Sequence, residues 1–182
     1  MKDFGNILIT VSGLPGSGTS TAAKLLSDKT GMELISTGEI FRELAKEEGY
    51  SLEEFGDVAE NNKNIDIELD ERIVRKAKPG RILEGRLTGH MLFRSDKDAY
   101  KVWIEADFKT RIKRIADRED KDLKETKKLV KQREKSEKKR YRDYYDIDLL
   151  DTDLYDIVID SSKNTPEEIV SKIIDGVLNG SY

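Results

Sequence analysis

The sequence predicts a three-layer α/β fold in which one parallel sheet of five strands lies between layers of helices. Short apolar runs alternate along the chain with longer amphipathic stretches, which is typical of a parallel sheet flanked by helices. The run ILITV at residues 7–11 is continuous and β-branched, as expected for a strand that is buried on both faces. A chain of 182 residues without internal repeats is long enough for one well-buried domain.

The first strand, at residues 7–11, leads through a glycine-rich turn into the first helix. This helix is expected to begin near Gly18, because Ala22, Ala23, Leu25 and Leu26 follow at helical spacing. Gly31 is placed to end it. A short second strand, MELI at residues 32–35, comes next.

Three helices are expected between the second and third strands. STGE at 36–39 and SLEE at 51–54 both have serine followed three residues later by glutamate, the pattern of a capping box. Apolar residues follow in each case: Ile40, Phe41, Leu44 and Ala45, then Phe55, Val58 and Ala59. The third helix runs from about Ile65 to Ala77 and ends at the turn 79–80. Asp66 and Asp70 share one face of this helix and could recognise a bound base or hold a metal-bound water, but we expect them to be exposed.

The second half of the chain supplies the remaining three strands. RILE at 81–84 and YKVWIE at 100–105 are strand candidates, with Trp103 in the core. The stretch GHMLF, with the single histidine His90, is interpreted as a loop. Residues 107–145 are almost all helix-forming and heavily charged. YDIVID at 155–160 is the fifth strand, and TPEE at 165–168 caps a last helix.

Composition excludes several classes of protein. The formal charge of −4 leaves no excess of positive charge to displace counterions, which argues against a protein that coats nucleic acid. Without cysteine, disulfides and thiolate zinc sites are impossible, and this fits a reducing compartment. The start MKDFGNILITVSG has no apolar run long enough for a signal peptide or a membrane span. We expect a cytoplasmic monomer that binds neither membranes nor nucleic acid.

The segment GLPGSGTST, residues 13–21, has most features of a phosphate-binding loop. It follows a strand, has two glycines at the required separation, and has a hydroxyl at Ser20 where a magnesium ligand belongs. Glycines let the backbone N–H groups turn inward, and the following helix N-terminus adds partial positive charge. Thr19, however, stands where the motif carries lysine, and it can donate only a neutral hydrogen bond. Loss of that charge costs about 2–4 kcal/mol of transition-state stabilisation unless another cation replaces it.

Five stretches together resemble the archaeal-type cytidylate kinases, a branch of the nucleoside monophosphate kinases of the P-loop superfamily. They are GLPGSGTST, STGEIFRELA from Ser36, ILEGRL from Ile82, REKSEKKRY from Arg133 and DIVIDSS from Asp156. That branch also carries threonine in the lysine position. The resemblance implies strand order 2-3-1-4-5 and magnesium-dependent transfer of the ATP γ-phosphate to CMP, and also to dCMP. It implies a core of residues 1–36, 79–118 and 143–182, an acceptor-binding region of 37–78 and a lid of about 119–142.

The resemblance also implies where the nucleotides bind. ATP would contact Gly13, Leu14, Pro15, Gly16, Ser17, Gly18, Thr19, Ser20 and Thr21. Ser36 and Thr37 would line the acceptor pocket, and Arg42 would grip the acceptor phosphate, for which a guanidinium fork is well suited.

Glu84-Gly85-Arg86 closes the third strand, where the loops of an open parallel sheet meet the ligand. It resembles an acidic-Gly-Arg segment of cytidylate kinases, which places the arginine on the CMP phosphate and the acidic group near the metal. Gly85 and Arg86 are thus candidate acceptor-binding residues, and Glu84 joins Ser20 as a candidate metal ligand. Most relatives have aspartate at this strand end, and Glu84 reaches further.

The charged helical segment contains arginines that could replace the missing lysine. Arg114 and Arg118 are four residues apart and share one helical face; they resemble an Arg-x3-Arg pair of adenylate kinases that stacks on the donor base and touches its phosphates. Arg133, Glu137 and Arg140 resemble the Arg-x3-Asp-x2-Arg of bacterial cytidylate kinases, which closes over the acceptor and the transferred phosphate. We expect Arg118, Arg133 and Arg140 to be catalytic, carried in by a lid with few apolar anchors.

Three alternatives stay open. Another small-acceptor kinase, for AMP or shikimate, would share the loop and the lid and differ in the pocket built by residues 40–75. A nucleotide-gated binding module would lack transfer activity. An RNA-binding protein could use the lysine-rich residues 121–142, although overall acidity and the lack of interleaved aromatics disfavour it.

Overall fold

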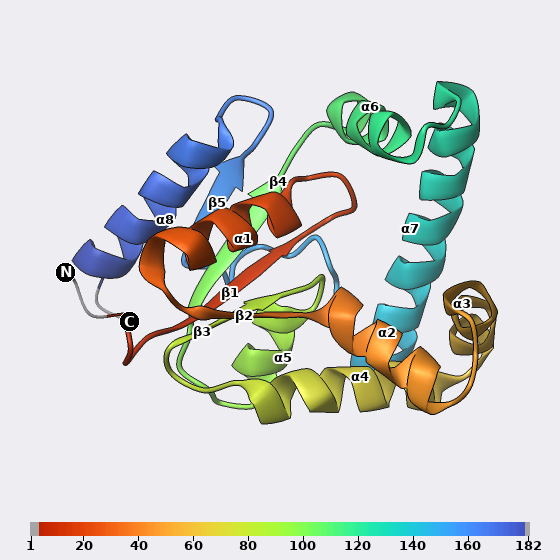
Figure 1. Ribbon diagram of the computed structural model, residues 1–182, viewed down its shortest axis with the longest axis horizontal. Coiled ribbons are helices and arrows are strands. Elements are labelled where there is room, and N and C mark those ends of the chain that lie inside the picture. The colour runs from red at the N-terminus through yellow and green to blue at the C-terminus, as the bar shows by residue number, and fades with distance from the viewer. Residues whose placement is uncertain (1–3, 181–182) are drawn as a thin grey trace.

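The computed structural model describes residues 4–180, without the side chains at positions 52, 53, 57 and 60. Within this range one parallel sheet contains five strands in the order β2-β3-β1-β4-β5 (Figure 1). The strands are β1 (Leu8–Gly13), β2 (Glu33–Ser36), β3 (Arg81–Glu84), β4 (Tyr100–Glu105) and β5 (Ile157–Asp160). The predicted fold class and strand order are confirmed.

Successive side chains of β1 point to opposite faces of the sheet, and both faces are covered by apolar clusters. Ile9 and Val11 are fully buried in one apolar cluster, together with residues of the first and last helices. Leu8, which points to the opposite face, belongs to a second cluster with residues of the helices between β2 and β3. A strand buried on both faces needs a continuous apolar run, and that is the pattern of the sequence here.

The helices form the outer layers of the fold. Their bounds are α1 (Thr19–Thr30), α2 (Thr37–Glu47), α3 (Leu52–Asn61), α4 (Lys63–Lys76), α5 (Thr88–Arg94), α6 (Phe108–Glu119), α7 (Leu123–Tyr145) and α8 (Pro166–Asn179). In Figure 1, α1 and α8 cover one face of the sheet, while α4 and α5 lie along the other. The elements α2, α3, α6 and α7 extend beyond the carboxyl ends of the strands, so side chains from several elements can converge there.

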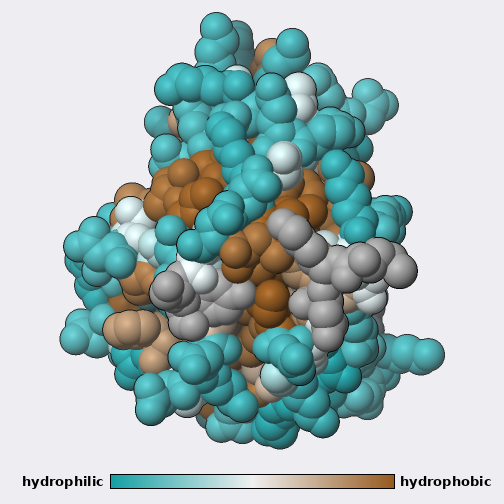
Figure 2. Space-filling view, turned by 90° about the vertical axis from the view of Figure 1, so that its left-hand side faces the viewer, coloured by the Kyte–Doolittle hydropathy of each residue, from teal (hydrophilic) through white to brown (hydrophobic). Residues whose placement is uncertain are grey.

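The described part of the chain begins and ends on the opposite side of the molecule (Figure 1). Viewed from that side, Figure 2 shows hydrophobic residues gathered in the middle of a largely hydrophilic face. Among residues 4–180, no helix is both long enough and apolar enough to cross a membrane.

Of the three predicted helix caps, those at Ser51 and Thr165 form, both as capping boxes. Ser51 with Glu54 and Thr165 with Glu168 each exchange both bonds of the box. The third prediction, at Ser36, is wrong: Ser36 is the N-cap of α2, but its hydroxyl makes no cap bond and donates to Glu84 Oε2 at 2.9 Å. A tertiary carboxylate partner thus replaces the local backbone donor.

The interpretation of GHMLF, residues 89–93, as a loop is also wrong, because residues 88–94 form α5. Its backbone is fixed to the sheet by Ser12, whose hydroxyl contacts Thr88 Oγ1 at 2.9 Å and accepts from the Gly89 N–H at 3.2 Å. His90 is buried there and stacks edge-on against Tyr155. Burial lowers the pKa of His90, consistent with a packing role. Residues 88–94 are therefore helical because of a contact with Ser12, which is distant in sequence and absent from any short sequence window.

The charged segment after β4 is helical, as predicted, but it is divided in two. Asp120 adopts a left-handed conformation with φ 52° and ends α6. Asp122 then caps α7 by accepting from the N–H groups of Lys124 and Glu125. The two helices run in different directions, and α7 passes on the side of the molecule where the strands have their carboxyl ends (Figure 1).

Candidate active site

The glycine-rich loop lies between β1 and α1, with Gly16 and Gly18 in the left-handed region at φ 80° and 95°. A Cβ atom on Gly16 would lie 2.6 Å from the backbone carbonyl oxygen of Arg111, so only glycine fits at this point. The Ser17 N–H bonds to the Leu14 carbonyl at 3.1 Å, which closes the turn. The predicted residues 13–21 therefore form one continuous turn that ends in the first turn of α1.

The carboxylate of Glu84, at the end of β3, is held by three hydroxyl groups from two other elements. Thr19 and Ser20, in the first turn of α1, donate to Oε1 at 2.8 and 3.1 Å. Ser36, at the end of β2, donates to Oε2 at 2.9 Å. The Thr37 hydroxyl bonds to the backbone carbonyl of Glu84 at 2.9 Å. The position that carries lysine in the motif is thus occupied by a hydroxyl that orients an acidic side chain.

Gly85 makes this arrangement sterically possible. A Cβ atom at this position would lie 1.9 Å from Thr37 Oγ1, a distance at which neither group could stay in place. The chain therefore turns sharply after Glu84 and directs Arg86 toward α7, where its Nε lies 2.9 Å from Glu137 Oε2. The other oxygen of Glu137 accepts from Arg133 Nε at 2.9 Å. Glu137 is 5% exposed and links the strand end to the helix.

Arg140 is one turn further along α7 and pairs with Asp66 of α4 at 3.1 Å. The side chains are 17% and 13% exposed, so the prediction that Asp66 faces solvent is wrong. Arg86 Nε is occupied by its ion pair with Glu137, whereas Arg140 pairs with Asp66 through Nη1, and its Nε is a buried nitrogen atom without a hydrogen-bond partner among the described residues. The Arg140 Nε is therefore available for a further acceptor, such as a phosphate oxygen.

Asp70 is likewise turned inward, contrary to the prediction. Its Oδ2 accepts from the Tyr145 hydroxyl at 2.7 Å. Burial raises the pKa of Asp70 to about 7; the hydrogen bond from Tyr145 lowers it in part, and the charge of Asp66 raises it further. Burial is also the main reason why the pKa of Asp66 is raised, against the opposing effect of Arg140.

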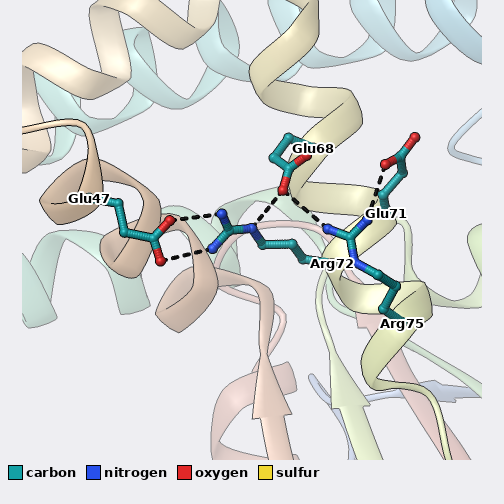
Figure 3. A network of polar contacts seen from close by, with 5 residues as sticks. All are labelled: Glu47, Glu68, Glu71, Arg72 and Arg75. Atoms are coloured by element: carbon teal, nitrogen blue, oxygen red, sulfur yellow. Dashed lines mark hydrogen bonds and ion pairs between the residues drawn. The ribbon is translucent and has the colours of Figure 1, made fainter.

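Helices α2 and α4, which form the predicted acceptor-binding region, are joined by an ion-pair network (Figure 3). The two Nη atoms of Arg72 bind the two oxygens of Glu47 at 3.1 and 2.7 Å, and its Nε binds Glu68 at 2.7 Å. Arg75 contacts Glu68 and Glu71 on the same helix. The two-pronged contact of Arg72 with Glu47 holds α4 against α2. It thereby helps to orient α4, the helix that carries Asp66.

The remaining predicted arginines do not share one environment. Arg114 is fixed beside the glycine-rich loop, with its Nη1 2.8 Å from Ser161 Oγ and 3.4 Å from the Gly16 carbonyl. Arg118, although on the same helix, is exposed and pairs with Glu119. Arg42 and Arg133 are also exposed at the surface, Arg133 with its Nε on Glu137. The structure thus gives Arg86, Arg140 and Arg114 polar partners from other elements, although Arg114 is itself exposed, as are Arg42, Arg118 and Arg133.

Two residues in this region were missed from the sequence. Ser161 accepts from Arg114 and donates to the Ser17 carbonyl at 2.6 Å, so it ties the loop to the end of β5. Arg111 is 4% exposed and donates to the Pro15 carbonyl at 3.1 Å. Arg111 comes three residues before Arg114, so the two share one face of the helix, and this spacing was the available signal for Arg111. The many charged residues around it obscured that signal.

The residues near Glu84 fit a magnesium ion that is held mainly by its nucleotide. Ser20 Oγ and the Glu84 carboxylate are 3.1 Å apart and offer oxygen ligands of the kind that Mg²⁺ prefers. Among residues 4–180, no group of three or more His, Cys, Asp or Glu side chains could hold a metal by protein ligands alone. Mg²⁺ bound with phosphates needs only one or two protein ligands, so this donor set fits.

Comparison with known proteins gives one consistent result. A family model described as the cytidylate kinase-like family matches residues 8–163. A cytidylate kinase of Methanosarcina mazei is 50% identical over 162 residues, which cover 85% of this chain and 87% of that protein. A cytidylate kinase of Methanocaldococcus jannaschii is 45% identical over 176 residues, with 94% and 99% covered.

Solved structures support the fold. A shikimate kinase of Aquifex aeolicus is similar with a TM-score of 0.57 and 20% identity, covering 96% of this chain and all of that chain. At this identity the likeness concerns the fold alone.

Proposed function

The chain belongs to the cytidylate kinase-like family, and on this basis we propose that it transfers the γ-phosphate of ATP to CMP, giving CDP and ADP. In this reaction an oxygen of the CMP phosphate forms the new bond to the γ-phosphorus, and the bond from that phosphorus to the bridging oxygen of ADP breaks. The observation that carries the proposal is the placement of two ion-paired arginines, Arg86 just after β3 and Arg140 on α7, with the Arg140 Nε left without a hydrogen-bond partner among the described residues.

The donor triphosphate would bind in the loop of residues 13–21. Its backbone N–H groups and the N-terminus of α1 offer positive charge to the phosphates. Two cations contact this loop: Arg111 donates to the Pro15 carbonyl at 3.1 Å, and Arg114, held by Ser161, donates to the Gly16 carbonyl at 3.4 Å. Bound Mg²⁺, with Ser20 and Glu84 as its ligands, would neutralise charge on the β and γ phosphates.

The acceptor would lie between the strand ends and α7. Arg86 and Arg140 would bind its phosphate, with Glu137 and Asp66 holding the two guanidinium groups in place beforehand. Ser36, Thr37 and Gly85 line the same strand ends, and Arg42 on α2 would reach the phosphate from the surface. Positioning of the two phosphates in line is most of what a protein contributes to this chemistry.

The lid arginines complete this proposal. Arg118 and Arg133 are exposed, and Arg133 is bound to Glu137, so both must move to act on phosphate. We propose that residues of about 119–142 close over the bound nucleotides, exclude water and bring this charge in. Turnover of dCMP, a monomeric state, a cytoplasmic location and a place in pyrimidine metabolism belong to the same proposal.

A coupled assay of ADP release tests the function. The protein is given ATP and Mg²⁺ with CMP, dCMP, UMP, AMP or shikimate, and CMP is expected to give the highest kcat/KM. A higher kcat/KM with AMP or shikimate would show that the proposed acceptor is wrong, while the proposed ATP site at residues 13–21 would be unaffected. Absence of transfer to every acceptor would favour a nucleotide-binding module, and salt-sensitive binding of single-stranded RNA would favour the RNA-binding alternative.

The variant Glu84→Gln tests the site within the same assay. Glutamine retains the size of the side chain but removes the charge that three hydroxyls orient, so kcat is expected to fall at least about a hundredfold. Glu105→Gln, an exposed change at the end of β4, is the matched control.

A further inference from the structure

Arg111 connects the glycine-rich loop to the lid helix. Its Nη1 donates to the Pro15 carbonyl at 3.1 Å and also contacts Glu134 Oε1 of α7, while its Nε donates to the Ala106 carbonyl at 3.2 Å. The guanidinium is therefore shared between the loop, the β4–α6 connection and α7. Its side chain is 5% exposed, so water screens these interactions little.

The helix that carries Arg111 lies directly against the loop. The carbonyl of Arg111 would be 2.6 Å from a Cβ on Gly16, so the loop has no room to shift toward α6 without moving it. Arg114, one turn further along, holds the next carbonyl at Gly16. Any change of the loop backbone on nucleotide binding therefore acts on α6 at once.

Contact between α6 and α7 has an apolar part and a polar part. Phe108, Ile112, Ile115 and Val130 form a small separate cluster. Such a contact is non-directional and permits sliding. The ion pair of Arg111 with Glu134 is directional, and it joins α7 to the same guanidinium that holds Pro15.

We propose that Arg111 is a positioning residue that couples occupancy of the donor loop to the position of α7, through Glu134. This inference rests on the proposed function for the identity of the acceptor, but the coupling itself concerns only the donor site and α7. When triphosphate occupies the loop, the Pro15 carbonyl and Arg111 are fixed, and Glu134 holds α7 in the position where Glu137 and Arg140 face the acceptor. Donor binding would then favour acceptor binding, and by linkage the reverse.

Amide hydrogen exchange of the full chain measures this coupling without turnover. The wild type and Glu134→Ala are compared with and without a non-hydrolysable ATP analogue and Mg²⁺. Alanine is the best helix former, and Glu134 is only partly buried, so the variant is expected to keep α7 folded. Glu125→Ala, at an exposed position of the same helix, is the matched control.

In the wild type, the analogue is expected to slow exchange in residues 13–21 and, about fivefold or more, in residues 123–145. Glu134→Ala should keep the effect on the loop and lose the effect on α7, and Glu125→Ala should keep both. A merely structural role would change exchange in α7 equally with and without the analogue. An equal analogue effect on α7 in wild type and Glu134→Ala, or no effect on α7 in a wild type whose loop is protected, would overturn the inference.

Calorimetric titration with CMP separates this inference from the proposed function. The analogue should tighten CMP binding in the wild type, and Glu134→Ala should remove most of that gain while its CMP affinity without the analogue changes little. If the wild type does not bind CMP but α7 still responds to the analogue, the acceptor assignment fails and the coupling stands. If CMP binds and the analogue changes its affinity equally in both proteins, the coupling fails and the function stands.

Discussion

Thr19 Oγ1 donates a hydrogen bond to Glu84 Oε1 at 2.8 Å, across 65 positions of sequence. The residue that replaces a lysine thus acts on the acidic group at the end of β3. A lysine here would meet the same carboxylate and form an ion pair with it. In this chain a neutral donor occupies the position, and the charge of Glu84 stays available to a metal.

Thr19→Val tests this relationship, because valine has nearly the same shape and lacks the hydroxyl. Glu84 would lose one of its three side-chain donors, and we expect kcat/KM for ATP to fall about tenfold, equivalent to about 1.4 kcal/mol. Thr19→Ser keeps the donor and should remain within about threefold of the wild type. Equal activity of the valine and serine variants would mean that Thr19 serves only as a spacer.

The lid arginines are tested by Arg118→Ala, Arg133→Ala and Arg140→Ala, measured singly by turnover. If guanidinium groups of α6 and α7 replace the lysine charge, at least one variant should lose more than about tenfold in kcat, and Arg140→Ala the most, because its group is already buried and held by Asp66. Arg142→Ala, exposed on the same helix, is the control. Losses below tenfold in all three would rule the hypothesis out.

Because the pKa of Asp70 is raised, we expect the stability of the protein to depend on pH. Its pKa is raised to about 7 in the folded protein, whereas the unfolded chain releases this proton near the ordinary value of 3.8. Between these two pH values the folded state binds more protons at Asp70 than the unfolded state does. The contribution of Asp70 to the free energy of unfolding is therefore fully present below about pH 4 and is lost as the pH rises to about 7.

Asp70→Asn removes this titration and retains an oxygen for the Tyr145 hydroxyl. Relative to the wild type, the variant should gain at least about 1.4 kcal/mol in free energy of unfolding between pH 4 and pH 7, the equivalent of one pKa unit. Urea denaturation at several pH values without ligand measures it. A constant difference across this range would show that Asp70 titrates normally.

Gly85→Ala predicts a steric effect at the strand end. The new Cβ would meet Thr37 Oγ1 at 1.9 Å, so the variant should lose about 1–3 kcal/mol of stability and most of its activity. Gly56→Ala on α3 should be neutral or more stable by up to about 1 kcal/mol, because no heavy atom of the described residues outside the neighbouring helix backbone lies within 4 Å of the added Cβ. Thermal unfolding of both variants is the measurement. Equal midpoints would contradict the geometry at Gly85.

Local pattern in the sequence was enough for the sheet and most helices. The run at 7–11 could be interpreted because a strand buried on both faces is apolar throughout, and Ser51 with Glu54 could be interpreted because a capping box is complete within four residues. Strand order and the function came from resemblance, since no local pattern contains them.

Local pattern failed where a partner far away in sequence decided the outcome. Ser36 has the spacing of a cap, but the Glu84 carboxylate takes its hydroxyl, and residues 88–94 form a helix because Ser12 anchors their first turn. Asp66 and Asp70 were expected to be exposed because a charged helix usually is, yet α7 packs over them and supplies Arg140 and Tyr145 as partners.

The sequence by itself determined the elements, the glycine-rich turn and the residue types available for phosphate chemistry, because these depend on neighbours within a few positions. Only the tertiary structure decided which charges are buried and paired: Arg86 with Glu137, Arg140 with Asp66, and Arg111 between Pro15 and Glu134. The physical reason is that the energy of a charge depends on its burial and on its partners in space, and both are set by how separate elements pack.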